Sequence, residues 1–416
     1  MTMDFNDSPL EADFRAGVRA WLDANQPTEL EGVLQRAVFG ELPLPVAEAL
    51  VAGRAWQQRK AAAGWACPSW PKAYGGRGAS PIEQVIWNQE EGVYARLAGP
   101  FVIGHGMCGP TLMVHGSEED RRRYLPPMAA GQEIWCQLFS EPAAGSDLAG
   151  IGIRAELAGD SWTVNGQKVW TSVAQHAQFG LLITRTDPKV VKHRGMTMFY
   201  VDMRTPGIEV RPIKQANGHY GFNEVFFTDV RIPDRQRLGA VGDGWKVALT
   251  TLMNERLAIG TGMPTGFDEI FALCAVLELP GGRALADRAV RSRLAAWAVR
   301  NSGLTYTACR AITALSRGAT PGPESSIGKL VAGSMMQEIA TWALDLEGRY
   351  GIVADAARAV DAGRFQSMLL RSPATRLEGG TDEILRNVIA ERVLGLPGDI
   401  RVDKDVPFNR IAAPGD

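Results

Sequence analysis

The sequence predicts an α+β fold in which helices, a β region and further helices follow one another along the chain. Apolar residues recur at helical spacing to about residue 130, and β-rich runs separated by turn residues continue to about residue 240. Helical spacing returns after Gly242-Asp243-Gly244. We therefore expect an N-terminal α domain over 1–130, a middle β domain over 131–240 and a C-terminal α-helical bundle over 241–416.

The first domain is expected to open with a helix at Pro9. Ser8 and Glu11 have the spacing of a capping box, and proline suits the first helical position. Gly, Pro and aromatic residues interrupt the helical pattern over 64–78 and 104–110. Both segments are predicted to be loops.

The middle domain is expected to be a small β barrel or sandwich. Residues 161–164 and 167–170 flank Asn165-Gly166, which is typical of a two-residue hairpin turn because both turn positions need positive φ. Further β-rich runs cover 180–186, 196–202, 207–213 and 223–233.

Two carboxylates stand out in the last domain. On the predicted helix 245–260, Glu255 shares a face with Ala248 and Leu252, so it is either functional or solvated at the edge of that face. Glu378 precedes Gly379-Gly380-Thr381 and an amphipathic helix. A glycine-rich approach to a helix start can leave N–H groups for an anion or a polarised carbonyl.

Composition excludes several classes of function. The formal net charge of −2 argues against non-specific nucleic-acid binding, which needs a clustered excess of Lys and Arg. The five cysteines are widely spaced, and no His or Cys shows metal-ligand spacing, so we expect no metal site. The acidic start is unlike a secretory or transit signal, and no apolar run approaches the ~20 residues of a membrane helix. We expect a cytoplasmic protein that neither spans nor binds a membrane.

The stretch QLFSEPAAGSD, residues 137–147, is a candidate ligand loop. Gly145 and Ser146 allow close backbone approach, and the hydroxyls of Ser140 and Ser146 are hydrogen-bond donors just past a predicted strand. Trp170 and Ser172 end a following predicted strand and would offer a planar ring and a further donor to a heterocycle. The alternative is that Trp170 belongs to the core.

Several stretches together resemble the acyl-CoA dehydrogenase superfamily. They are GWACPSWPKAYGGRG at 64–78, IWCQLFSEPAAGSD at 134–147, VNGQKVWTS at 164–172 and LEGGTDEILRNVIAERVLG at 377–395. The resemblance implies an N-terminal helical domain, a middle β-barrel or sandwich domain and a C-terminal four-helix bundle, as read above from periodicity.

The resemblance also implies FAD as cofactor and an acyl-CoA thioester as substrate. Its implied cofactor contacts are Gln137, Phe139, Ser140, Gly145, Ser146, Trp170, Ser172, Thr381 and Glu383. Ser146 and Arg256 are the implied substrate contacts.

The implied reaction removes the α proton to a glutamate and the β hydride to flavin N5, with electrons passed to an electron-transfer flavoprotein or similar acceptor. Asn254-Glu255-Arg256 matches the base position of the isovaleryl and long-chain types, so Glu255 is the first candidate. Glu378 is the runner-up, one residue before the position that carries the base in the medium-chain type. The N–H of Gly379 is the implied donor to the thioester carbonyl.

Two departures from the family pattern bear on assembly. Residues 271–293 lack the Arg-x-x-x-Phe-Gly stretch that is typical of the family. In 345–351, Asp345 stands in place of Gln and Arg349 in place of Gly in the family's Gln-x-x-Gly-Gly-x-Gly stretch, which would disturb the hold on a neighbour's FAD. We therefore expect a homo- or hetero-tetramer, with a paralogous subunit supplying the missing half, in lipid or steroid catabolism. The alternatives are a non-catalytic partner subunit and a flavin oxidase or monooxygenase on the same fold.

Overall fold

The computed structural model describes residues 6–37, 42–259, 264–318, 322–323, 325–353, 355–398, 400 and 403–411, without the side chains of 256–259 and 325. The chain forms two compact units. The larger comprises Phe14–Gln35, Pro43–Glu255 and Asp399–Asp416, and the smaller comprises Met1–Asp13, Arg36–Leu42 and Arg256–Gly398.

The N-terminal region is helical, as predicted. Its α-helices are α1 (Pro9–Asn25), α2 (Glu31–Gln35), α3 (Val46–Ala62), α4 (Pro81–Glu91), α5 (Gly109–His115) and α6 (Glu118–Ala129). The capping box at the start of α1 is confirmed, because the Ser8 N–H donates to the Glu11 carboxylate at 2.7 Å and the Glu11 N–H to the Ser8 hydroxyl at 3.4 Å.

The prediction of a loop over 104–110 is wrong. Gly104–Cys108 is a π-helical segment that leads directly into α5. The glycines serve close packing here, because a Cβ on Gly109 would overlap the Trp70 ring and one on Gly104 would press on Met128. The segment 64–78 is mostly turns, as predicted, with one short helical turn at Lys72–Tyr74.

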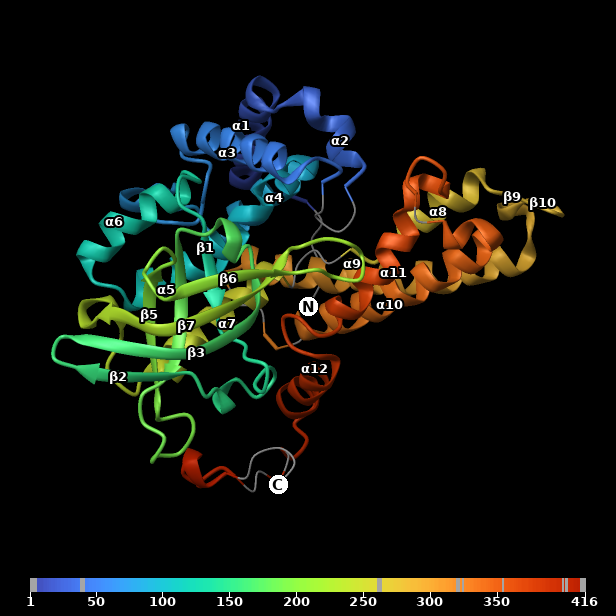
Figure 1. Cartoon of the computed structure of the whole chain (residues 1–416). Helices are drawn as coiled ribbons and strands as arrows, with labels where there is room; N and C mark the ends of the chain where they lie inside the picture. The colour runs from blue at the N-terminus through green and yellow to red at the C-terminus, as the bar shows by residue number, and fades with distance from the viewer. Residues whose placement is uncertain are drawn as a thin grey trace. The chain divides into compact units, whose positions relative to one another are not determined.

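The middle region is a single sheet of eight strands (Figure 1). They are β1 (Trp135–Leu138), β2 (Arg154–Ala158), β3 (Ser161–Ser172), β4 (Phe179–Arg185), β5 (Met196–Asp202), β6 (Ile208–Ile213), β7 (Phe222–Pro233) and β8 (Arg237–Leu238). The order is β6-β7-β3-β2-β4-β5-β8, with β1 parallel to β4. Only the pair Arg154 and Arg185 joins β2 to β4.

The sheet has an apolar cluster on each face. Every residue of β4 is buried, and its side chains point alternately to the two faces of the sheet. Leu181 and Ile183 lie in a cluster shared with α5, α6 and α7 (Gly244–Ile259). Leu182 joins Phe199 and Val225 in the other cluster, which lies among the strands. The β region therefore rests on helices along β1, β4 and β5.

The predicted hairpin turn at Asn165-Gly166 is wrong. The turn lies at Gly159 and Asp160, between paired Ala158 and Ser161, and β3 continues straight through Asn165 and Gly166. The register against β7 shifts at this point, and the Asn165 amide donates to the Asp229 carboxylate at 3.0 Å. Glycine is needed at 166 because the backbone of Ile153 passes within 2.9 Å of where its Cβ would lie.

The smaller unit is helical and has its own core. Its elements are the end of α7, then α8 (Phe267–Val276), β9 (Glu278–Leu279), β10 (Gly282–Arg283), α9 (Arg288–Ser316), α10 (Ser325–Glu347), α11 (Arg364–Thr375) and α12 (Asp382–Val388). Trp297, Met335 and Phe365 from α9, α10 and α11 are fully buried together. The helix, β, helix order predicted from the sequence is confirmed.

Within the described ranges, none of the individual helices has the length and apolar character for a membrane crossing; one strongly bent pair, Pro81–Phe101 with Gly104–His115, has them only when taken together.

We predict that two alanine substitutions in the β2–β3 region will differ in cost. Gly159→Ala adds only the strain of a positive φ at an open turn, roughly 1 kcal/mol. Gly166→Ala adds a collision with Ile153 and should cost a few kcal/mol. Thermal unfolding of the two variants measures the order; equal losses, or a greater loss for Gly159→Ala, would contradict the observed strand pairing.

Candidate functional site

Past the end of β1, residues 139–152 form a loop that places small residues at the surface. We call this segment the 139–152 loop. The N–H of Glu141 donates to Ala144 O at 2.9 Å, and the N–H of Ala144 donates back to Glu141 O at 3.0 Å, which closes a tight turn. Gly145 and Ser146 are exposed beyond this turn, whereas Phe139 is buried. Two predicted contact residues are therefore open to a ligand.

A buried lysine holds the first half of the 139–152 loop. Lys168 on β3 is fully buried, and its ammonium donates to Phe139 O at 2.8 Å and to the Glu141 carboxylate at 2.9 Å. Glu141 also accepts from the N–H of Gly152 at 2.7 Å, so it links both ends of the loop. Burial lowers the pKa of Lys168 to about 8, although the Glu141 charge opposes that change.

A buried arginine holds the second half. Arg185, at the end of β4, donates from Nη2 to Ala149 O at 2.5 Å and to Ile151 O at 3.2 Å. Burial lowers its pKa to about 10, against the charges of Glu141 and Asp147, so the guanidinium keeps its charge at neutral pH. Neither cation is among the site residues predicted from the sequence. The indication in the sequence was a charged residue within an apolar β-rich run (Lys168) or at its end (Arg185).

Trp170 is exposed, so the alternative that it belongs to the core is wrong. Its side chain is 58% exposed and its φ is +58°, at a register shift between β3 and β7. The Val169 N–H donates to Ser140 O at 2.9 Å, which joins this strained segment to the 139–152 loop. A large ring held outside the core by a strained backbone is typical of a ligand platform.

The residues beside Trp170 carry polar groups. Ser172 is half-buried, and the hydroxyl of Thr171 is buried without a hydrogen-bond partner among the described residues. An exposed ring and an accessible small-residue loop on adjoining segments fit a planar cofactor with polar edges.

Glu255 lies beside β1 in the larger unit. The face of α7 that precedes it is packed on the core, with Val247, Ala248 and Thr251 fully buried. Thr251 is hydrogen-bonded to Thr111 of α5 at 2.9 Å. Glu255 itself is half-buried, and its carboxylate accepts a long hydrogen bond of 3.4 Å from the Gln137 amide. A rigid helix thus brings a carboxylate to the strand from which the 139–152 loop begins.

Glu378 lies in the smaller unit and is engaged by a neighbour. Arg371 Nη2 is 2.8 Å from each of its two carboxylate oxygens. Gly379 has a φ of +63° and Gly380 a φ of +98°, while Lys329 donates to Gly380 O. The N–H of Gly379 stays a predicted donor to the thioester carbonyl, and the Glu378 carboxylate already has a cationic partner.

The remaining predicted residues of the smaller unit lie at the start of α12. The Thr381 hydroxyl accepts from the Ile384 N–H at 3.3 Å and caps this short helix. The side chain of Glu383 is 74% exposed. The side chain of Arg256 lies outside the described part of the chain, so its assignment to substrate stays a prediction.

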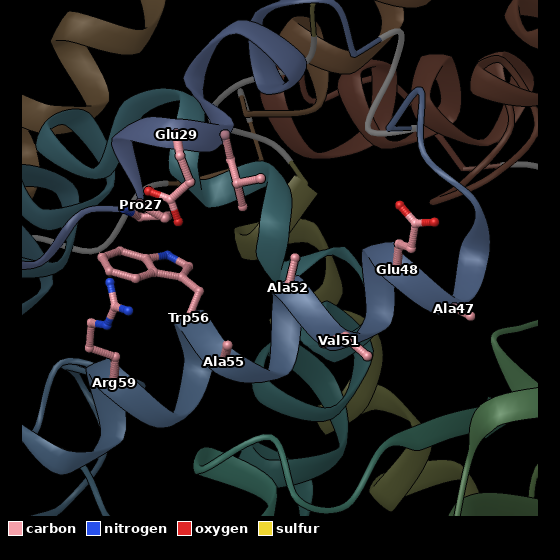
Figure 2. Close-up of a pocket in the computed structure, with 10 residues that line it drawn as sticks. Pro27, Glu29, Ala47, Glu48, Val51, Ala52, Ala55, Trp56 and Arg59 are labelled. Carbon is pink, nitrogen blue, oxygen red and sulfur yellow. The ribbon is translucent and has the colours of Figure 1, made fainter.

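The larger unit also carries a surface groove. It has a volume of about 430 Å³ and runs along α3 beside Pro27 and Leu30, with Trp56 at its floor and Glu29, Glu48 and Arg59 among its lining residues (Figure 2). None of the predicted site residues lines it. The candidate functional site is therefore assigned to Trp170, Glu255 and the 139–152 loop, and not to the groove.

Models of known families match the chain in three successive segments. The model described as Acyl-CoA dehydrogenase, N-terminal domain, matches residues 36–132. Those for the middle and C-terminal domains of the same family match 136–230 and 242–394.

Individual proteins match along nearly the whole chain. The acyl-CoA dehydrogenase IpdE1 of Mycobacterium tuberculosis is 38% identical over 398 residues, which are 94% of this chain and 98% of that protein. Among solved structures, the ChsE4-ChsE5 complex from Mycobacterium tuberculosis has a TM-score of 0.77 at 27% identity, covering 95% of this chain and 100% of that chain. A steroid ACAD, Tcur3481-Tcur3483, has a TM-score of 0.76 at 28% identity, with the same coverage.

We predict that Lys168 gives the protein a specific pH dependence of stability. Its folded pKa of about 8 lies below the ordinary 10.5, so the unfolded chain binds more protons between these values. The contribution of Lys168 to the free energy of unfolding should therefore rise with pH across this window, by up to about 3 kcal/mol. Denaturation of the wild type, Lys168→Met and the exposed control Lys189→Met at pH 7.5 and 10 tests this. From pH 7.5 to 10 the stability of Lys168→Met relative to the wild type should fall, and that of Lys189→Met should not; the same pH slope in all three would contradict it.

Proposed function

Since the chain belongs to the acyl-CoA dehydrogenase family, we propose that it oxidises an acyl-CoA thioester between the α and β carbons, with FAD as cofactor. Bound FAD would supply the hydride acceptor at flavin N5. The protein must then position the thioester, accept the α proton and stabilise the negative charge that develops on the carbonyl oxygen.

Glu255 is the proposed base, and the observation that carries this is its placement beside Gln137. The carboxylate is half-buried on a helix fixed by the core and lies next to β1, which leads into the 139–152 loop. Glu378 is less suited, because Arg371 already donates to both of its oxygens. A general base must lie within hydrogen-bond reach of the proton it removes.

The cofactor is proposed to lie against Trp170 and the 139–152 loop. The exposed ring of Trp170 would cover one face of the flavin, while Ser172 and Ser140 would hydrogen-bond its polar edge. The open backbone at Gly145 and Ser146 suits the remainder of the cofactor and the substrate chain. Thr381 and Glu383 of the smaller unit are further proposed cofactor contacts. The N–H of Gly379 is the proposed donor to the thioester carbonyl.

We further propose that a paralogous subunit completes the assembly. The surface that replaces the family's glycine-rich stretch carries exposed Asp345 and Arg349, with Arg349 stacked 5.2 Å from the Tyr350 ring. Tyr350 and Ile352 are exposed beside them, at 47% and 88%. Bulky side chains here support a protein partner over a bound phosphate. By analogy with the steroid ACAD relative, the substrate is proposed to be a bulky acyl-CoA ester. The electron acceptor that the family resemblance implies, an electron-transfer flavoprotein or similar protein, is kept as part of the proposal.

Glu255→Gln should lower turnover roughly 10²- to 10⁴-fold, because the amide cannot accept the α proton. The flavin absorbance of the purified protein should be unchanged, since Glu255 is not among the proposed cofactor contacts. Turnover with an artificial electron acceptor, expressed per bound FAD, measures the effect.

Glu378→Gln is the comparison variant and should lose less than about tenfold. If Glu378→Gln is instead the more damaged variant, the base is Glu378. If neither variant loses turnover, no carboxylate proposed here is the base.

The assembly proposal predicts low FAD occupancy when the chain is purified alone. Co-expression with a paralogous acyl-CoA dehydrogenase subunit from the same genome should raise the ratio of FAD to protein, measured from the flavin and protein absorbance of the complex. A homotetramer of this chain alone with full FAD occupancy would contradict the proposal.

A further inference from the structure

Residues 403–411 lie against the connection between β4 and β5, and we call them the 403–411 strap. The Phe408 N–H donates to Val190 O at 2.9 Å, and the Asn409 N–H donates to Pro188 O at 2.9 Å. Val191 and Pro407 form an isolated antiparallel bridge. Figure 1 shows this last stretch, drawn in red, packed against the green β4–β5 connection. The strap is thus docked by backbone pairing.

Lys192 joins the strap to the 139–152 loop. Its ammonium lies 2.5 Å from the Asp403 carboxylate and 2.9 Å from that of Asp147, which follows Ser146. The Lys192 side chain is only 12% exposed. Burial alone would lower its pKa, but the hydrogen bonds to the two carboxylates outweigh burial and raise it. The Asp403 side chain is 32% exposed and that of Asp147 is 61% exposed, so the mostly buried ammonium links a partly buried carboxylate of the strap to an exposed one of the loop.

Arg185 makes a second connection between the same segments. Its guanidinium stacks 3.9 Å from the Phe408 ring, and it also donates to Lys192 O. The same guanidinium donates to Ala149 O and Ile151 O in the 139–152 loop. The ring covers the guanidinium and keeps water from it, which strengthens these hydrogen bonds.

We propose that the 403–411 strap positions the 139–152 loop, with Lys192 as the positioning residue. Through Lys192 and Arg185 the strap fixes the backbone from Asp147 to Ile151, and so the neighbouring Ser146. This inference rests on the proposed function, which places Ser146 at the acyl-CoA chain. Releasing the strap should therefore weaken acyl-CoA binding more than it slows the chemical step.

The decisive variant is Asp403→Asn, because release of the strap and a simple charge effect predict opposite changes in KM. It removes a negative charge, so a simple effect of charge on an anionic CoA ester would lower KM. Release of the strap would raise KM, and we expect a rise of roughly 3- to 30-fold with kcat changed less than about twofold. A lowered or unchanged KM would overturn the proposal.

Lys192 is tested against a lysine of the same connection. Lys192→Met should raise KM as Asp403→Asn does, and Lys192→Arg should restore most of the affinity. Lys189→Met removes the same charge from an exposed side chain and should leave KM within about twofold. Equal rises in KM for Lys189→Met and Lys192→Met would show a general charge effect and overturn the proposal.

Hydrogen exchange separates this inference from the proposed function. Amide exchange over residues 141–153 should be faster in Asp403→Asn and Lys192→Met than in the wild type, and unchanged in Lys189→Met. This readout does not require acyl-CoA turnover. If the wild type oxidises no acyl-CoA ester but exchange responds as expected, the strap is upheld and the proposed function fails. Unchanged exchange in both variants would overturn the strap itself.

Discussion

The structure around the candidate site depends on the need to satisfy two buried cations. Lys168 and Arg185 project into the protein from neighbouring parts of one sheet, where an unpaired charge would be strongly unfavourable. Their partners are Glu141 and the carbonyl oxygens of the 139–152 loop. Because those carbonyls turn inward to the cations, the loop presents Gly145 and Ser146 outward. Internal electrostatics therefore shape the surface proposed to hold the cofactor.

The proposed chemistry depends on the same rigid framework. Glu255 is carried by a helix whose inner face is buried and tied to α5 through Thr251, and Gln137 joins its carboxylate to β1. The irregular strand segment at Trp170 is linked to the 139–152 loop by the hydrogen bond from the Val169 N–H to Ser140 O. Glu255, the Trp170 ring and the 139–152 loop thus belong to one tightly packed unit. Such preorganisation keeps reacting groups aligned without further loss of conformational entropy.

Periodicity predicted the elements well, because burial acts along whole segments. The helix carrying Glu255 and the strands β4 to β7 begin and end within one residue of the predicted ranges. The errors fall where distant packing overrides a local signal. Asn165-Gly166 has turn chemistry but is paired with β7, and the glycines of 104–110 make room for Trp70 and Met128. Resemblance supplied the candidate residues, but it could not show that Trp170 is exposed or that Glu378 is paired with Arg371.

The most direct test of the central claim is an experimental structure of the FAD-loaded protein with a non-reactive acyl-CoA analogue. The quantity to measure is the distance from the Glu255 carboxylate to the α carbon. We predict about 3.5 Å, with the Trp170 ring against the flavin and Ser146 at the CoA chain. A complex in which Glu255 faces solvent, or in which the flavin lies away from Trp170 and the 139–152 loop, would contradict the proposed site.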